Sequence, residues 1–208
     1  EIIVLDEPTS YLDIRYKLEL LDILKRMAKK KGITVLMSLH EIDLAQKCAD
    51  KIVCVRGEEI MAYGTPEEVF HEETIEKLYD LDNGSYNPLS GSLELKKTEG
   101  EPEVFVISSG GNGTPIYRKL QREGRPFAAG ILYTNDVDYQ AARVLASKII
   151  TEEPFEEISD NTYKNAENMI DRCQIVVDAG VHIGSCNHRM RNLLQYAQEK
   201  GKLKRDYL

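Results

Sequence analysis

The chain has 208 residues, 42% of them hydrophobic, and its 35 acidic and 27 basic side chains give a net charge of −8. This length fits one large or two small domains with a real core, and no apolar run reaches the ~18 to 20 residues of a membrane helix. The acidic surplus argues against a general nucleic-acid binder, because the phosphate backbone attracts clustered lysine and arginine. The composition predicts a globular protein without a membrane span, whose partners are proteins or Mg²⁺-neutralised anions.

The charge is unevenly distributed, which is a first indication of two units. Residues 1–96 hold 12 basic and 19 acidic side chains, whereas residues 97–208 hold 15 and 16. The four cysteines form no C-x-x-C pair and nothing resembles a signal peptide, so we expect free thiols in a reducing cytosol. Because Glu1 opens directly into an apolar run, the chain resembles the distal part of something longer.

The first eighty residues alternate between strand and helix patterns. The β-branched run Ile2–Leu5 predicts a strand buried on both faces of a parallel sheet. Apolar residues spaced three or four apart then predict an amphipathic helix that starts at Ile14 and ends at Gly32. A Thr-Pro-Glu-Glu sequence at 65–68 predicts the start of another helix. Between them, the pattern predicts a strand over 33–39, a helix over 41–49 and an antiparallel pair over 52–55 and 60–62.

A change of pattern near residue 81 predicts a domain boundary. Turn-forming clusters without periodicity fill residues 81–103, which we interpret as a linker between a domain over 1–80 and a domain over 104–208. The second domain alternates strands with helices, a pattern that predicts a small Rossmann-like unit with a parallel sheet and an α/β fold class. Its expected strands are 104–107, 128–133, 148–151 and 175–177, and its expected helices are 116–123, 139–147, 162–173 and 188–200.

The sharpest motif follows the first strand. Four apolar residues lead into Asp6 and Glu7, so both carboxylates follow the carboxyl end of a strand, where open α/β sheets place ligands. In phosphoryl transfer, one carboxylate at such a place holds Mg²⁺ and a neighbour deprotonates the attacking water. Taken alone, an acidic pair more often caps the next helix and faces solvent, so the surrounding sequence has to decide.

That surrounding sequence resembles the distal half of ABC-type ATPases over residues 1–80. Four segments resemble, in order, the Walker B and D-loop string, the switch-histidine segment and the closing strands of that family: Asp6–Asp13, Val35–Glu41, 49–57 and 62–69. Four ordered segments at suitable intervals make the resemblance specific, and it implies a partial P-loop ATPase core. The stretches Ser10–Arg15 and Leu39–Ala45 look most like those of ATP-binding subunits of importers for iron-siderophore, haem and cobalamin complexes.

The resemblance implies a role for five residues. Asp6 would bind the Mg²⁺ of the nucleotide, through water, and Glu7 would be the general base that activates the attacking water. His40 would hydrogen-bond the γ-phosphate, a role that suits an imidazole because it donates at neutral pH without a permanent charge. Ser10 and Asp13 would belong to the loop that touches the opposite subunit when two such domains enclose ATP. As a lone residue, His40 would more often be a structural histidine.

Departures from the family pattern are equally informative. No G-x-x-x-x-G-K-[ST] sequence occurs, and the stretch 89–92 lies after the Walker B string and reads as linker, not as the family's signature sequence. We therefore expect this chain alone to be inactive, and the full-length protein to be an ATPase coupled to import. The implied partners are a second ATP-binding subunit, as a homodimer, and membrane permease subunits. The implied location is cytoplasmic, on the inner face of the membrane.

A second candidate site lies in the second domain. A glycine-rich turn between the first strand and the first helix of that domain would present free backbone N–H groups to an anion, with Thr114 as the N-cap and Pro115 at the first helical position. The candidate ligand residues are Ser109, Gly110, Gly111, Asn112, Gly113 and Thr114. Tight turns need glycine in any case, so a structural role is the competing interpretation.

Two alternatives stay open. The chain could act without catalysis, as a nucleotide- or anion-binding regulatory module that functions through residues 104–208. In addition, His182, Cys186 and His188 form an H-x₃-C-x-H pattern that suits a metal, although a fourth ligand at standard spacing is missing and loop residues are the simpler interpretation.

Overall fold

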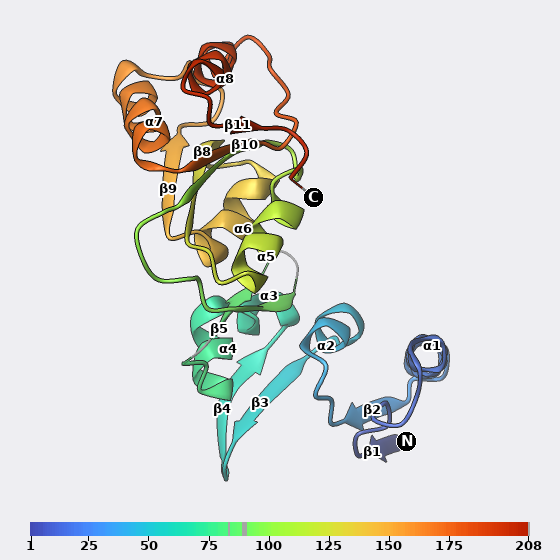
Figure 1. Ribbon diagram of the computed structural model, residues 1–208. Coiled ribbons are helices and arrows are strands. Elements are labelled where there is room, and N and C mark those ends of the chain that lie inside the picture. Colours follow the sequence, from blue (N-terminus) through green and yellow to red (C-terminus); the bar gives the residue numbers. More distant parts are fainter. Residues whose placement is uncertain (83, 89–90, 208) are drawn as a thin grey trace. The chain divides into compact units, whose positions relative to one another are not determined.

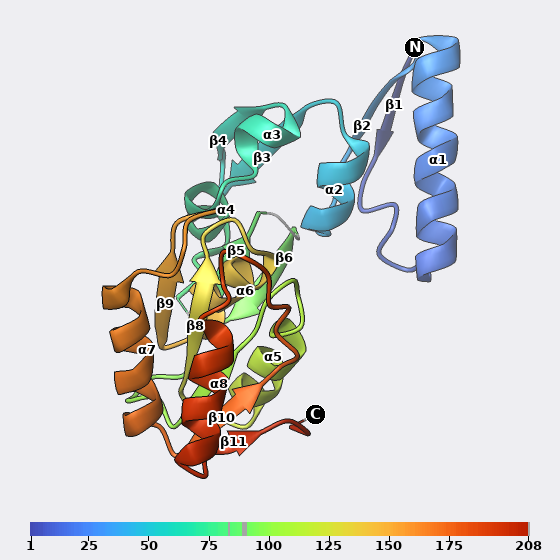
Figure 2. The same ribbon diagram turned by 90° about the horizontal axis from the view of Figure 1, so that it is seen from above.

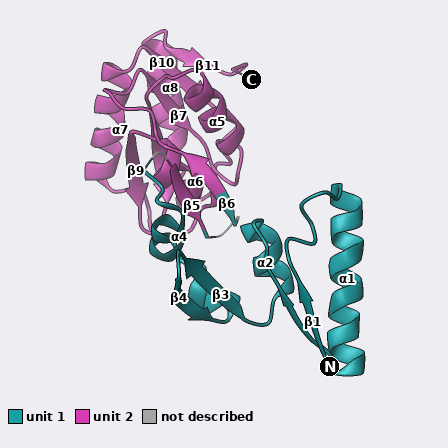
Figure 3. Ribbon diagram, turned by 90° about the horizontal axis from the view of Figure 1, so that it is seen from below, with its two compact units in different colours: residues 1–82, 88–92 teal, residues 83–87, 93–208 magenta. Residues whose placement is uncertain are grey.

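The computed structural model describes residues 1–82, 84–88 and 91–207. They divide into two compact units: Glu1–Asp82 with Pro88–Ser92, and Asn83–Asn87 with Leu93–Leu208 (Figure 3). The stretch 89–92, interpreted above as linker, lies partly outside the described residues. None of the helices among the described residues combines the length and the apolar character of a membrane span.

The first unit is built around a parallel pair of strands. Strand β1 (Ile2–Leu5) pairs with β2 (Thr34–Met37), and helix α1 (Ile14–Lys31) connects them and lies alongside the pair (Figures 1 and 2). The elements that follow are α2 (Ile42–Cys48), the antiparallel strands β3 (Ile52–Arg56) and β4 (Glu59–Gly64), α3 (Pro66–Val69) and α4 (Glu72–Tyr79). The order of elements predicted from the sequence is confirmed as far as α3, and α4 is a helix that the sequence pattern did not predict.

Helix termini in this unit follow the local sequence. Asp13 is the N-cap of α1, and its side chain accepts hydrogen bonds from the backbone N–H groups of Arg15 and Tyr16. Gly32 ends α1 in the left-handed conformation, with φ of 62°. Thr65 and Glu68 form the predicted capping box at the start of α3.

The prediction that the first strand is buried on both faces is wrong for this structure. Side chains along β1 alternate between exposed and half-buried, and Ile2 and Val4 are 70% and 69% exposed. Both side chains lie on one face of the strand, and the described residues leave that face largely exposed. The apolar run therefore marks a surface that remains open in this chain.

Residues 84–95, predicted to belong to the linker, contain two strands. Strand β5 (Gly84–Asn87) and strand β6 (Ser92–Leu95) form a two-stranded sheet. Tyr86 of β5 is fully buried, and β5 contacts helix α6 of the second unit. This pairing could not be predicted from the sequence, because each strand has only four residues and lies between turn-forming clusters.

The second unit is a five-stranded sheet covered by helices on both faces, as expected for a Rossmann-like unit. The strand order is β11-β10-β7-β8-β9, and all four neighbouring pairs are parallel. The strands are β7 (Val104–Ile107), β8 (Phe127–Tyr133), β9 (Lys148–Glu152), β10 (Ile175–Asp178) and β11 (Leu203–Lys204). The helices are α5 (Thr114–Arg122), α6 (Val137–Leu145), α7 (Asp160–Arg172) and α8 (Met190–Glu199).

Two apolar layers hold this sheet. Side chains of α5 and α6 pack with Val104, Val106 and Val177 on one face. Side chains of α7 and α8 pack with Phe105, Ile107 and Val176 on the other face. Alternate residues of β7 thus enter opposite layers, which is the period of two that a strand buried on both faces requires.

Candidate functional site

The acidic pair and the histidine segment meet at one end of the β1–β2 pair. The parallel register places Leu5 opposite Met37, so the chain leaves both strands at the same edge. Asp6 and Glu7 follow β1 directly, and His40 follows β2 after two residues. The structure thus brings together three side chains that the sequence predicted as a site, from positions more than thirty residues apart.

Ser38 joins the two acidic residues. Its hydroxyl donates a hydrogen bond to Asp6 Oδ1 at 2.7 Å and accepts one from the backbone N–H of Glu7, also at 2.7 Å. Glu7 has a φ of 42°, in the left-handed region that residues other than glycine rarely adopt. Ser38 had no role among the predicted site residues, and the available signal was its place directly after β2, two residues before the histidine.

Both oxygens of the Glu7 carboxylate have partners. His40 Nε2 donates to Oε1 at 2.6 Å, and Ser10 Oγ donates to Oε2 at 2.9 Å. These hydrogen bonds, chiefly the one from His40, lower the pKa of the Glu7 carboxyl below its ordinary value. Glu7 is therefore an exposed carboxylate at neutral pH, already oriented by two side chains.

The Glu7–His40 contact predicts a measurable titration. A carboxyl whose pKa is lowered by folding contributes stability above its unfolded pKa and loses that contribution as the pH falls through the folded pKa. We expect the ¹³C resonance of the Glu7 carboxyl to titrate at lower pH in the native chain than in a His40→Ala variant, followed by NMR over the acidic range. Equal titration midpoints of the Glu7 carboxyl in the native chain and in His40→Ala would contradict the hydrogen bond between Glu7 and His40.

The loop between Glu7 and α1 is fixed at two points. The buried hydroxyl of Thr9 donates to Glu41 Oε2 at 2.9 Å, and Lys17 of α1 pairs with Oε1 of the same carboxylate. Asp13 caps α1, so its carboxylate is occupied by helix N–H groups. Glu41 follows His40, and the loop that carries Ser10 is therefore tied to the histidine segment.

The donor set around Asp6 suits a magnesium ion that keeps most of its water. Within the described residues, no group of three or more histidine, cysteine or acidic side chains could hold a metal by itself. Mg²⁺ at nucleotide sites is commonly bound by one or two carboxylates together with water and phosphate oxygens. The single carboxylate of Asp6 at the strand end fits that mode.

The glycine-rich loop of the second unit is occupied by the protein's own carboxylates. The fully buried Asp138 accepts hydrogen bonds from the backbone N–H of Gly113 at 2.9 Å and of Thr114 at 3.0 Å, and from Thr114 Oγ1 at 3.0 Å. Asp136 accepts from the N–H of Gly110 with both oxygens, at 3.0 and 3.1 Å. An anion at these N–H groups would have to displace both carboxylates.

The remaining residues of this loop contact the segment after β10. Ser109 Oγ accepts from the N–H of His182 at 3.0 Å, and Asn112 Nδ2 donates to the carbonyl oxygen of Gly180 at 3.0 Å. Gly111 is left-handed, with φ of 93°, and a side chain there would meet no atom within 4 Å. The N-cap of α5 is Gly113 and not Thr114 as predicted, since Thr114 is the first helical residue and its hydroxyl donates to Asp138. Ligand binding by residues 109–114 stays a prediction.

The H-x₃-C-x-H residues make separate contacts. His188 Nδ1 contacts the carbonyl oxygen of Ser185 at 2.8 Å, and Cys186 Sγ donates to the carbonyl oxygen of Phe155 at 3.3 Å. All four cysteines are free. Because no metal-binding group forms among the described residues, these contacts favour the loop interpretation.

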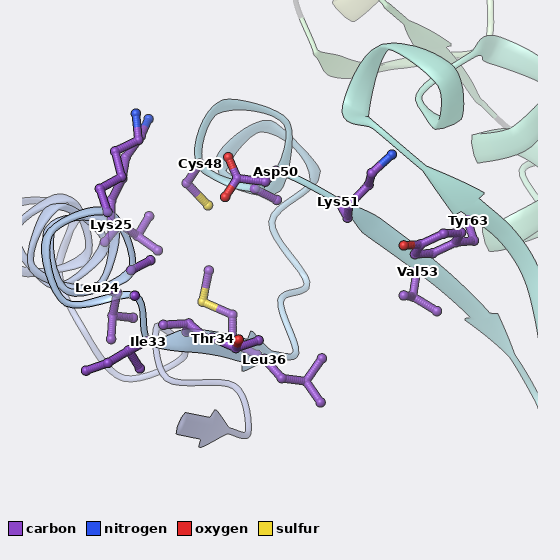
Figure 4. A pocket seen from close by; sticks show the side chains of 17 residues that line it. Leu24, Lys25, Ile33, Thr34, Leu36, Cys48, Asp50, Lys51, Val53 and Tyr63 are labelled. Carbon is purple, nitrogen blue, oxygen red and sulfur yellow. The ribbon is translucent and has the colours of Figure 1, made fainter. Parts of the chain in front are cut away.

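A cavity of about 620 Å³ opens in the first unit. It lies between α1, β2 and α2 on one side and β3 and β4 on the other (Figure 4). Apolar side chains such as Leu24, Ile33, Leu36 and Val53 form much of its lining. Residues of β2 and of β3 line this space, and the two strand pairs of the unit are separate sheets.

The sequence of this chain is similar to one family model and to several known proteins. The MJ0874 family model matches residues 127–204. The uncharacterized ABC transporter ATP-binding protein MJ0873 of Methanocaldococcus jannaschii is 37% identical over 133 residues, which cover 64% of this chain and 46% of that protein. The cobalamin import ATP-binding protein BtuD of Halobacterium salinarum is 25% identical over 172 residues, covering 79% of this chain and 43% of BtuD.

A third relative is the ferric enterobactin transport ATP-binding protein FepC of Escherichia coli, 38% identical over 80 residues, 38% of this chain and 30% of FepC. The chain thus spans less than half the length of these relatives. The match to BtuD covers 79% of this chain and therefore extends well beyond residue 80. The expectation that the resemblance is confined to residues 1–80 is wrong. The homologues of this chain are ATP-binding proteins of ABC transporters, including proteins named for siderophore and cobalamin import.

Proposed function

We propose that this chain is the distal part of the ATP-binding and ATP-hydrolysing subunit of an ABC importer for an iron complex, haem or cobalamin. The observation that carries the proposal is the arrangement of Asp6, Glu7, Ser38 and His40 at the shared end of β1 and β2. A carboxylate for Mg²⁺, a carboxylate for water and a hydrogen-bond donor for phosphate are the groups that ATP hydrolysis needs in one place.

Each residue has a defined task in this proposal. Asp6 holds Mg²⁺ through water, and the ion supplies charge neutralisation at the phosphates when it is bound. Glu7 takes a proton from the attacking water, since its lowered pKa keeps it ionised at neutral pH. His40 already donates to an anionic oxygen of Glu7, and the same N–H can donate to the γ-phosphate when ATP is present.

The proposed assembly requires a P-loop half and a partner. The chain contains no phosphate-cradling lysine loop, and it covers less than half of its relatives. The apolar cavity between β2 and β3 and the exposed face of β1 are the surfaces that such a preceding half would cover. Ser10 and Asp13 would face a second ATP-binding subunit, in a homodimer on the inner face of the membrane that contacts permease subunits.

The proposal is tested by comparing this chain with a longer polypeptide that includes the coding sequence upstream of Glu1. We expect Mg²⁺-dependent phosphate release from the longer polypeptide and none from the 208-residue chain. Binding of a fluorescent ATP analogue should follow the same division. An upstream sequence without a P-loop lysine, or hydrolysis by the short chain alone, would overturn the proposal.

A further inference from the structure

We propose that Ser38 is a positioning residue whose one hydroxyl group holds the side chain of Asp6 and the backbone of Glu7, and through that backbone orients the Glu7 carboxylate. This inference rests on the proposed function of ATP hydrolysis, and it adds a residue to which the family resemblance gave no task. The proposed function assigns the chemistry to Asp6, Glu7 and His40, whereas Ser38 acts through the first two of these residues.

The hydroxyl of Ser38 is used in both directions. It donates to Asp6 Oδ1 and accepts from the N–H of Glu7, at 2.7 Å in each case. A serine hydroxyl can donate only one hydrogen bond, and here it donates to Asp6. Its oxygen can accept a hydrogen bond at the same time, and here it accepts from the N–H of Glu7. The hydrogen bond from the Glu7 N–H lies at the short end of the range for N–H···O, and the one to Asp6 has an ordinary length and is assisted by the charge of the carboxylate.

The backbone of Ser38 is itself fixed by the sheet. Its N–H donates to the carbonyl oxygen of Leu5 at 3.1 Å, which continues the β1–β2 ladder by one step. The backbone position from which the hydroxyl projects is therefore fixed by a hydrogen bond of the sheet. Asp6 and Glu7, by contrast, lie beyond the last paired residue of β1, where the ladder no longer constrains them.

Glu7 depends on this contact most. Its left-handed backbone conformation is unusual for a residue with a side chain, and the hydrogen bond from its N–H to Ser38 stabilises that conformation. The same backbone conformation presents the carboxylate to His40 and Ser10. Loss of the hydroxyl should therefore disturb the base and its partners while β1 and β2 stay paired.

The first test measures the hydrogen bond directly in the 208-residue chain. We expect the Glu7 amide to exchange with deuterium about ten-fold faster in Ser38→Ala than in the native chain, and to regain protection in Ser38→Thr, which restores the hydroxyl. Ser185→Ala, at an exposed loop of the second unit, is the control. Unchanged exchange in Ser38→Ala would overturn the inference, and circular dichroism confirms that each variant is folded.

The second test uses the longer polypeptide with its P-loop half. We expect Ser38→Ala to lower kcat about ten-fold with little change in KM for ATP, and Ser38→Thr to restore most of kcat, because one charge-assisted hydrogen bond is lost and regained. A merely structural serine would affect stability and leave the kcat of the folded enzyme unchanged, which would overturn the inference.

The two proposals fail in different ways. If Glu7→Gln in the same polypeptide abolishes hydrolysis but Ser38→Ala matches the native kcat, the inference about Ser38 is wrong and the proposed function stands. If Glu7→Gln hydrolyses ATP normally, the assignment of the base is wrong. The amide exchange experiment still decides whether Ser38 holds Glu7.

Discussion

Glu7→Gln is expected to lower ATP turnover by roughly 10²–10⁴-fold in a polypeptide that joins this chain to its P-loop half. The carboxamide keeps the size of the side chain and can still accept from Ser10 or His40, but it cannot take a proton from water. Because the phosphates are held by other groups, ATP binding should persist. Single-turnover phosphate release and equilibrium binding of ATP measure the two effects separately.

Glu41→Gln is a suitable comparison for this experiment. Glu41 lies next to His40 and contacts Thr9 and Lys17, so its substitution changes charge near the site without touching the predicted base. It should alter turnover far less than Glu7→Gln does. Equal losses from the two substitutions would indicate that negative charge in this region matters, and that no single carboxylate serves as the base.

Asp138→Ala is expected to destabilise the second unit by roughly 3 kcal/mol, because it leaves the N–H groups of Gly113 and Thr114 without their acceptor in a buried place. For a unit of this size, that loss corresponds to a fall in Tm of roughly 10 °C. Thermal unfolding followed by near-ultraviolet circular dichroism would report it, since tyrosines of this unit pack in its core.

Asp138→Asn separates shape from charge. Its amide oxygen can accept from one N–H, but its amide nitrogen must face the other donor, so part of the stability should be lost. Asp160→Ala, at an exposed position at the start of α7, provides a control for removing a carboxylate. A Tm of Asp138→Ala within 2 °C of the native value would contradict the structural role, on a scale where ~1 kcal/mol shifts Tm by several degrees.

The meeting of Asp6, Glu7 and His40 could be predicted from sequence because it depends on few choices. Two apolar runs joined by one helix form a parallel pair, and residues that follow parallel strands meet at the same edge. The cap at Thr65 was equally accessible, since this residue type satisfies helix N–H groups locally, whereas the cap at Asp13 was not predicted. The roles of the three site residues remain predictions.

Other features depended on contacts distant in sequence. Asp138 reads as an ordinary acidic residue in the first turn of a helix, and only the packing of α6 beside α5 turns it toward the glycine-rich loop. The sequence could show that this loop has N–H groups to offer, but not that Asp136 and Asp138 accept from them. Ser38 was overlooked for the same reason, since its partners lie 31 and 32 residues away.

The one-to-one register of β1 and β2 has a consequence for how this protein can vary. Successive side chains of a strand point to opposite faces, so one inserted residue within 34–37 would put Met37 at the position of Ser38, and one deleted residue would put Leu39 there. The turn at Gly32 and the length of α1 are free of that constraint, because they affect the connection and not the pairing. We therefore expect insertions to be tolerated at the end of α1, near Gly32, and to be disruptive within β2, at residues 34–37.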